Sequence, residues 1–375
     1  MDHMARKQEK QYHQNLKKMN IINQINQSLS LLTLVFGTTV VAQNVPKIEH
    51  KPEQPLIEKV NNSKVVNFDF IIENTTKDTL KLTKLEVRQF DKNNILVQQK
   101  FLDNNGTAPS INTIPSNIWN GVAKKMIFNP FPEINSVTTK LEYIFTFNNN
   151  IEIKQTVSPK EYQQTNDFIL PLKDKLLVYD GHDFNSHHRR FDYEFEPIKQ
   201  LGFESNFMRY AYDFTILNNE NKQFSGDGKS NEEWFGFGKE VIAVADGEVV
   251  ALETLQKDDK TFDIPSLKNN PLALYGNYVV IKHANNVLSM YAHLKNKSSE
   301  HLKPGTKVKQ GQLIGLIGTS GSSFFPHLHF EVRDTINHQA EGIPSYFNNY
   351  SLILGSTKKE IKTGTVNTGD IIKTK

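Results

Sequence analysis

The chain has 375 residues, of which 37% are hydrophobic and 23% charged, and it contains no cysteine. This composition is typical of a soluble protein with enough chain for two domains. The absence of cysteine excludes disulfide bonds and thiolate ligands, so a metal site would have to use histidine, aspartate or glutamate.

The first 42 residues are predicted to be a signal peptide. A basic stretch ending at Lys18 precedes an apolar run from Leu29 to about Val41, and Ala42 provides a small residue at a cleavage site. The apolar run is short for a membrane span, and no later run reaches that length; an uncleaved anchor is the alternative. We therefore expect export to the periplasm or the extracellular envelope, with no stable membrane span after cleavage.

Charge bears on possible partners. Residues 1–42 carry five Lys or Arg and two acidic side chains, and the whole chain has a net charge of +3. The part after the signal peptide would thus be close to neutral, which argues against nucleic acid as a partner.

Two segments precede the histidine-rich half of the chain. Residues 43–62 are polar and contain three prolines, which predicts a linker. Residues 63–160 contain short alternating runs, separated by asparagine-rich turns at a spacing of about ten residues. We predict an immunoglobulin-like β-sandwich. It contains no histidine, so a structural or wall-positioning spacer is favoured over a ligand-binding module.

A His-x-His pair, His327 and His329, is the most informative motif. In a strand these residues project from the same face, about 6–7 Å apart. That spacing suits one imidazole that binds a metal and another that handles protons. Asp213 and His293 follow other strand-like runs. Asp, His and His-x-His on short strands are a typical layout of a zinc hydrolase.

From about Tyr179 to Phe347 the chain resembles the M23 (lysostaphin/LytM-type) zinc metallopeptidases, which cut peptide crosslinks in bacterial cell walls. The resemblance is carried by an ordered set of motifs, namely Asp213-Phe214, Ala245-Asp246-Gly247, Tyr291-Ala292-His293-Leu294, Val308-x-x-Gly311-x-x-Ile314-Gly315 and His327-Leu328-His329-Phe330. It implies an antiparallel β-sheet peptidase domain, placed here at residues 175–350 and followed by a C-terminal tail at 351–375. It also implies that Asp213 and His329 bind Zn²⁺ and that His293 and His327 assist catalysis.

The chain departs from the family pattern at one position. The family's first histidine ligand stands four residues before the aspartate, where this chain has Arg209, whose guanidinium cannot bind zinc. Some branches of the family resemble this chain, and in them the second histidine of an upstream pair is the ligand. This points to His188, with His187 as the alternative. The expected metal ligands are therefore His188, Asp213 and His329.

The resemblance implies an exported zinc metalloendopeptidase that hydrolyses peptide bonds in peptidoglycan crosslinks. His327 would act as the proton acceptor, and His293 would orient the attacking water or stabilise the oxyanion. Glu331 shares a face with His329 and is expected to be a solvated charge or to support that ligand, rather than to act as a base. The alternative is a catalytically inactive LytM-like regulator that binds and activates another cell-wall hydrolase; retention of all four site residues favours the enzyme.

Two polar insertions, 215–236 and 254–271, are expected to wall a groove over this site, because loops of this kind carry binding surfaces. Phe324 and Phe325 are candidates to line the groove, with core packing as the alternative.

Overall fold

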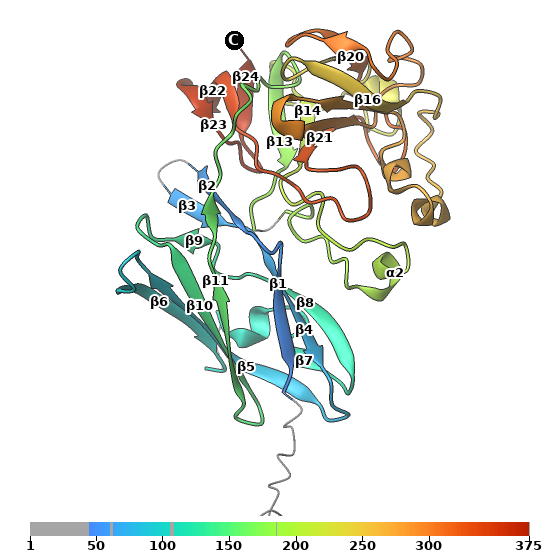
Figure 1. Ribbon diagram of the computed structural model, residues 1–375. Coiled ribbons are helices and arrows are strands. Elements are labelled where there is room, and N and C mark those ends of the chain that lie inside the picture. The colour runs from blue at the N-terminus through green and yellow to red at the C-terminus, as the bar shows by residue number, and fades with distance from the viewer. Residues whose placement is uncertain (1–44, 61–62, 106–108, 185, 375) are drawn as a thin grey trace, which may run out of the picture. The chain divides into compact units, whose positions relative to one another are not determined.

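The computed structural model describes residues 45–60, 63–105, 109–184 and 186–374 (Figure 1). The predicted signal peptide lies outside these residues. The described chain is mainly β, as expected, and residues 46–375 form one compact unit. Among the described residues, no helix has the length and apolar character needed to cross a membrane.

The N-terminal part of this unit contains three sheets. The first has the order β1 (Lys47–Lys51), β4 (Asp69–Asn74), β8 (Ala123–Phe128). The second has the order β11 (Glu152–Val157), β10 (Lys140–Phe147), β5 (Leu80–Phe90), β6 (Leu96–Asp103), and β7 (Ile118–Trp119) also pairs with β5. The third has the order β12 (Lys160–Glu161), β2 (Leu56–Val60), β3 (Ser63–Val66), β9 (Glu133–Ile134).

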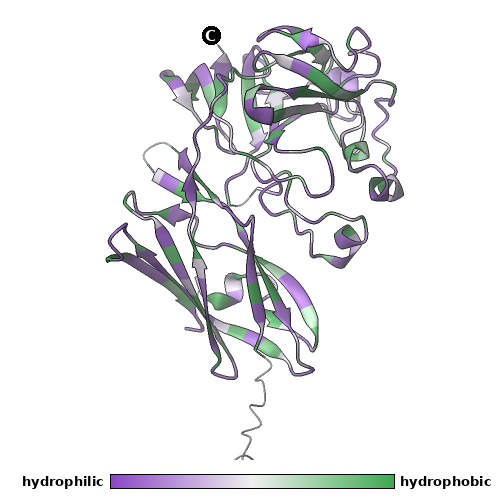
Figure 2. Ribbon diagram, in the orientation of Figure 1, coloured by the Kyte–Doolittle hydropathy of each residue, from purple (hydrophilic) through white to green (hydrophobic). Residues whose placement is uncertain are grey.

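The first two of these sheets share a hydrophobic core. Hydrophobic and hydrophilic residues alternate along several of their strands (Figure 2), which turns one face of each strand inward. Phe70 on β4 packs its ring 4.7 Å from that of Tyr143 and 4.9 Å from that of Phe145, both on β10. Such packing is compatible with a sandwich, whereas the immunoglobulin-like character remains a prediction.

The linker expected over residues 43–62 is replaced by two strands. β1 pairs antiparallel with β4, and β2 pairs antiparallel with β3. Both strands are rich in Lys and Glu, and Ile57 is 3% exposed. The polar composition concealed these strands, while Pro52 and Pro55 lie between the two strands and do not interrupt either.

The C-terminal part is built on a ten-stranded sheet in which neighbouring strands pair antiparallel. Its order is β19 (Lys307–Val308), β16 (Gly247–Glu253), β17 (Tyr278–Lys282), β18 (Leu288–Ala292), β21 (Leu328–Arg333), β14 (Tyr212–Ile216), β13 (Lys175–Asp180), β24 (Ile371–Thr374), β22 (Phe347–Leu354), β23 (Thr357–Gly364). A separate pair joins β15 (Glu240–Ile242) to β20 (Leu313–Leu316).

The helical segments of the described residues are short. They are η1 (Ile111–Thr113), α2 (Glu196–Lys199), η2 (Asn231–Glu233), η3 (Ile264–Lys268), η4 (Pro271–Tyr275) and η5 (Ala284–Asn286). The predicted C-terminal tail contributes strands to the large sheet, since β24 pairs with β13 and with β22.

The central strands of the large sheet are buried on both faces. Val279 and Ile281 of β17 belong to one core cluster, while Val280 between them belongs to another. Alternate residues of a strand point to opposite faces, so the near-continuous apolar sequence of β17 reflects cover on both sides. The second cluster also contains Ile71 of β4 and Met126 of β8. The N-terminal sheets therefore contribute side chains to a core that lies against the sheet of the C-terminal part.

Candidate metal centre

Strand pairing brings the expected site residues together from distant parts of the chain. Asp213 of β14 is the register partner of His329 on β21, and Asp180 of β13 is paired with Asp213 from the other side. Ala292 of β18 is also opposite His329, which places His293 just beyond the end of that strand. The antiparallel register thus assembles a cluster that no local stretch of sequence contains.

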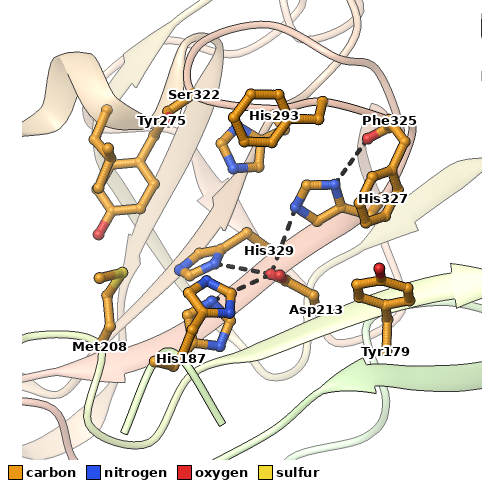
Figure 3. A pocket seen from close by; sticks show the side chains of 13 residues that line it. Tyr179, His187, Met208, Asp213, Tyr275, His293, Ser322, Phe325, His327 and His329 are labelled. Atoms are coloured by element: carbon orange, nitrogen blue, oxygen red, sulfur yellow. Dashed lines mark hydrogen bonds and ion pairs between the residues drawn. The ribbon is translucent and has the colours of Figure 1, made fainter. Parts of the chain in front are cut away.

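The carboxylate of Asp213 is the centre of this cluster (Figure 3). Its Oδ1 lies 3.0 Å from Nδ1 of His329, 3.5 Å from Nε2 of His188 and 3.5 Å from Nε2 of His327. All four side chains are buried, with at most 7% of each exposed. Two of the expected ligands, His188 and His329, therefore face the third from different elements.

The adjacent histidines His187 and His188 differ in their surroundings. His188 exposes 2% of its side chain, and its Nδ1 lies 3.3 Å from Oδ2 of Asp180, which leaves Nε2 directed at Asp213. His187 exposes 67% of its side chain and makes its Nδ1 contact with the same Asp180 oxygen. One potential ligand atom from each of these four residues lies within 4.8 Å of the others. The geometry favours His188 over His187 as the ligand beside Asp213.

A second carboxylate supports His329 from behind. Nε2 of His329 lies 3.4 Å from Oε2 of Glu331, a residue with no exposed surface. The hydroxyl of Tyr275 donates to Oε1 of Glu331 at 2.8 Å, and Arg333 contacts the same carboxylate. A carboxylate beyond the ligand fixes the orientation of an imidazole. Glu331 therefore supports His329 in the way expected from the sequence and leaves Nδ1 facing Asp213.

His293 and His327 are held in similar ways. Nδ1 of His293 lies 2.8 Å from the Ser320 carbonyl, and Nδ1 of His327 lies 2.8 Å from the Phe325 carbonyl. A carbonyl only accepts, so each Nδ1 carries the proton and each Nε2 is unprotonated. The two rings are 4.8 Å apart between centroids. His293 also adopts a left-handed φ of 58°, a conformation uncommon for residues other than glycine.

The electrostatics of the cluster favour the forms that bind metal. Burial lowers the pKa of His188 to about 3 and also lowers the pKa values of His293 and His327. Burial alone would raise the pKa of Asp213, but the neighbouring imidazoles, chiefly His188 and His327, bring it well below its usual value. The lowered pKa values keep His188, His293 and His327 neutral at neutral pH and keep Asp213 ionised, and ligands must be deprotonated to bind a metal.

An open pocket of about 470 Å³ gives access to these side chains (Figure 3). Phe324 and Phe325 line it, as predicted, and 82% of Phe324 is exposed. Trp234, from the polar insertion 215–236, stacks on Phe325 with ring centroids 5.0 Å apart. The ring of Tyr179 also meets the ring of Phe325 edge-on, with centroids 4.7 Å apart. Aromatic side chains thus lie beside the buried histidines at this pocket.

Two residues near the upstream histidine pair have partners elsewhere. Nε2 of His182, a further histidine of this segment, lies 2.9 Å from the buried carboxylate of Glu58, so it is not part of the cluster. Arg209 forms ion pairs with Asp69 and Glu341, in agreement with its exclusion as a ligand.

Sequence reasoning missed Asp180 and Tyr275. Asp180 ends an apolar strand only a few residues before the histidine pair, and that position was a usable signal. Tyr275 ends the short 3₁₀ segment η4, and no local pattern indicated its contact with Glu331.

Part of the C-terminal half of the chain is similar to known proteins. Residues 235–343 match the model of Peptidase family M23. The peptidoglycan DD-endopeptidase ShyA of Vibrio cholerae is 48% identical over 65 residues, which are 17% of this chain and 14% of that protein. The murein hydrolase activator NlpD of Escherichia coli is 35% identical over 96 residues, which are 26% of this chain and 20% of that protein. The resemblance to the M23 family is thereby confirmed.

A solved structure, the catalytic domain of lysostaphin from Staphylococcus simulans, is 24% identical and covers 38% of this chain and 79% of its own, with a TM-score of 0.23. The matched segments span less than a quarter of the two curated relatives. The family match includes His293, His327 and His329 but begins after His188 and Asp213. The strand pairing and side-chain distances described above bring His188 and Asp213 together with the histidines of the matched segment.

Proposed function

We propose that this chain is an exported zinc metalloendopeptidase that hydrolyses peptide bonds in peptidoglycan crosslinks. The observation that carries the proposal is the convergence of three imidazole nitrogens on one oxygen of Asp213, at 3.0–3.5 Å, beside an open pocket. A peptidoglycan endopeptidase among the relatives supports the choice of substrate.

The donor set fits zinc. Two imidazoles and one carboxylate, from His188, His329 and Asp213, are typical ligands of a catalytic zinc site with an open fourth position. His188 and His329 each have a carboxylate behind the ring, from Asp180 and Glu331, as is usual for histidine ligands. When bound, Zn²⁺ supplies a Lewis acid and lowers the pKa of water toward neutrality.

His327 and His293 would carry out the proton transfers. Because the Phe325 carbonyl accepts from Nδ1 of His327, Nε2 of this residue is free to accept a proton from the attacking water and to deliver it to the leaving amine. Nε2 of His293 is unprotonated for the same reason and would accept a hydrogen bond from the attacking water and so orient it. The aromatic side chains of Tyr179, Phe324 and Phe325 would hold the peptide in the pocket.

The alternative function is a regulator that activates another cell-wall hydrolase, and it is supported by the similarity to an activator. Purified sacculi distinguish the two. The zinc-loaded chain should release soluble peptides, and a chelator should stop the release until zinc is restored. A chain that holds zinc stoichiometrically and releases no peptides would contradict the enzyme and support the regulator.

A further inference from the structure

A buried carboxylate outside the metal centre connects the N-terminal sheets to it. Asp69, the first residue of β4, has no exposed surface. Its Oδ1 accepts a hydrogen bond from Arg189 at 2.7 Å, and its Oδ2 accepts one from Arg209 at 2.7 Å. Both arginine side chains are also fully buried. One carboxylate of the N-terminal part is therefore the shared partner of two arginines of the C-terminal part.

The two arginines stand next to the proposed ligands. Arg189 directly follows His188, and Arg209 begins the short segment that leads into β14 and Asp213. Besides its bond to Asp69, Arg189 donates from Nε to the Asn67 side chain at 3.2 Å and from a terminal nitrogen to the Phe68 carbonyl at 2.9 Å. Three consecutive residues before and at the start of β4 thus fix the residue beside His188.

Asn206 links the two arginine segments directly. Its side-chain amide donates to the carbonyl of His188 at 3.1 Å and to that of Arg189 at 3.3 Å. Its own carbonyl accepts from the backbone N–H of Arg209 at 3.2 Å. The loop that carries His188 and the segment that leads to Asp213 therefore form one hydrogen-bonded unit, with Asp69 bonded to both parts.

The charges within this unit are balanced. Arg189 and Arg209 face Asp69 and Glu341, and Glu341 pairs with Arg209 at 3.1 Å. Removing one partner of a buried ion pair leaves an uncompensated charge, which the structure relieves by moving the remaining group or admitting water. Loss of the Asp69 charge would therefore shift the two segments that carry His188 and Asp213.

We propose that Asp69 is a positioning residue of the metal centre, which acts through Arg189 and Arg209 to hold His188 and Asp213 in the binding geometry. The inference rests on the proposed zinc site and adds a role for the N-terminal sheets, whose residues would then be required for metal affinity as well as for packing.

The first test is Asp69→Asn in the full chain, with the zinc Kd measured by competition with a chelator. We expect zinc binding to weaken about 10–100-fold, as for other residues that orient metal ligands, while the far-ultraviolet circular dichroism stays that of the wild type. Val87→Ala is the matched control, because Val87 is buried in the core of the N-terminal sheets and its truncation lowers stability without touching Asp69. This control should keep the wild-type Kd; an equal loss of zinc affinity in both variants would overturn the proposal.

A second variant covers the case in which Asp69→Asn does not fold. Arg189→Lys keeps a positive charge for Asp69 but cannot make all the contacts with Asn67, Phe68 and Asp69. We expect weaker zinc binding in this variant. Without metal, we also expect faster hydrogen exchange at the backbone amide of residue 189, which in the wild type donates to the Ser186 hydroxyl at 3.1 Å. A folded variant of either kind with unchanged Kd would overturn this inference and leave the proposed function standing. Absence of zinc binding by the wild type would overturn both.

Discussion

Asp213 and His329 stand opposite each other on β14 and β21, and Oδ1 of Asp213 lies 3.0 Å from Nδ1 of His329. The pairing explains why an aspartate and a histidine separated by more than a hundred residues can serve one metal. It also fixes which imidazole nitrogen faces the carboxylate, because Nε2 of His329 is directed at Glu331. The register of two central strands therefore determines the geometry of the proposed site.

Replacement of His329 by alanine should abolish zinc binding and activity. Only His188 and Asp213 would remain as ligands, and two protein ligands rarely hold Zn²⁺ tightly. Zinc content per chain, measured by atomic spectroscopy after dialysis, gives the result. His301→Ala is the control, since His301 is an exposed histidine outside the cluster; stoichiometric zinc in the His329→Ala protein would refute the assignment.

The paired histidines His187 and His188 provide a sharper comparison. His188→Ala should lose zinc as severely as Asp213→Ala, because Nε2 of His188 faces the Asp213 carboxylate. His187→Ala should retain zinc, because this side chain is 67% exposed and contacts Asp180 instead. Metal content of the three variants distinguishes the assignments. Retention by His188→Ala together with loss by His187→Ala would reverse them.

The sequence was informative about the site because the proposed chemistry uses histidine and aspartate side chains in distinctive motifs. The family resemblance, together with these histidines and the aspartate, predicted which side chains meet, and the structure brings His188, Asp213, His293, His327 and His329 into one pocket. Their metal-binding and catalytic roles stay predictions. Supporting residues such as Tyr275 were not predictable in the same way, because no local pattern indicates its contact with Glu331.

The N-terminal part was harder to predict. The mainly β character followed from alternating runs, whereas β1 and β2 were hidden in a segment rich in lysine, glutamate and proline. The contacts of Asp69 with Arg189 and Arg209 join residues more than a hundred positions apart. Local patterns carry no information about such pairings, so the sequence suggested a separate spacer where the structure shows shared buried charges.

The two remaining histidines should separate chemistry from metal binding. His327→Ala should keep zinc and lose turnover by about 10²–10⁴-fold, the usual effect of removing a general base. His293→Ala should behave similarly, because its Nε2 is free and its Nδ1 is bonded to a backbone carbonyl. Peptide release from sacculi and zinc content are measured on the same preparations. Loss of zinc from either variant would place that residue among the ligands.

The stability of the metal-free protein should depend on pH through His188. Burial lowers the pKa of this imidazole from 6.5 to about 3, so between these values the unfolded chain binds a proton that the folded chain does not. Stability is thus fully present above about pH 6.5 and is lost as the pH falls toward 3, by about 1.4 kcal/mol per pH unit for one such group. Urea unfolding in the presence of a chelator, from about pH 7 to about pH 5, measures this slope. His188→Gln should reduce the slope by about one proton, whereas the exposed control His301→Gln should leave it unchanged; an identical slope in wild type and His188→Gln would show that His188 is not held neutral by burial.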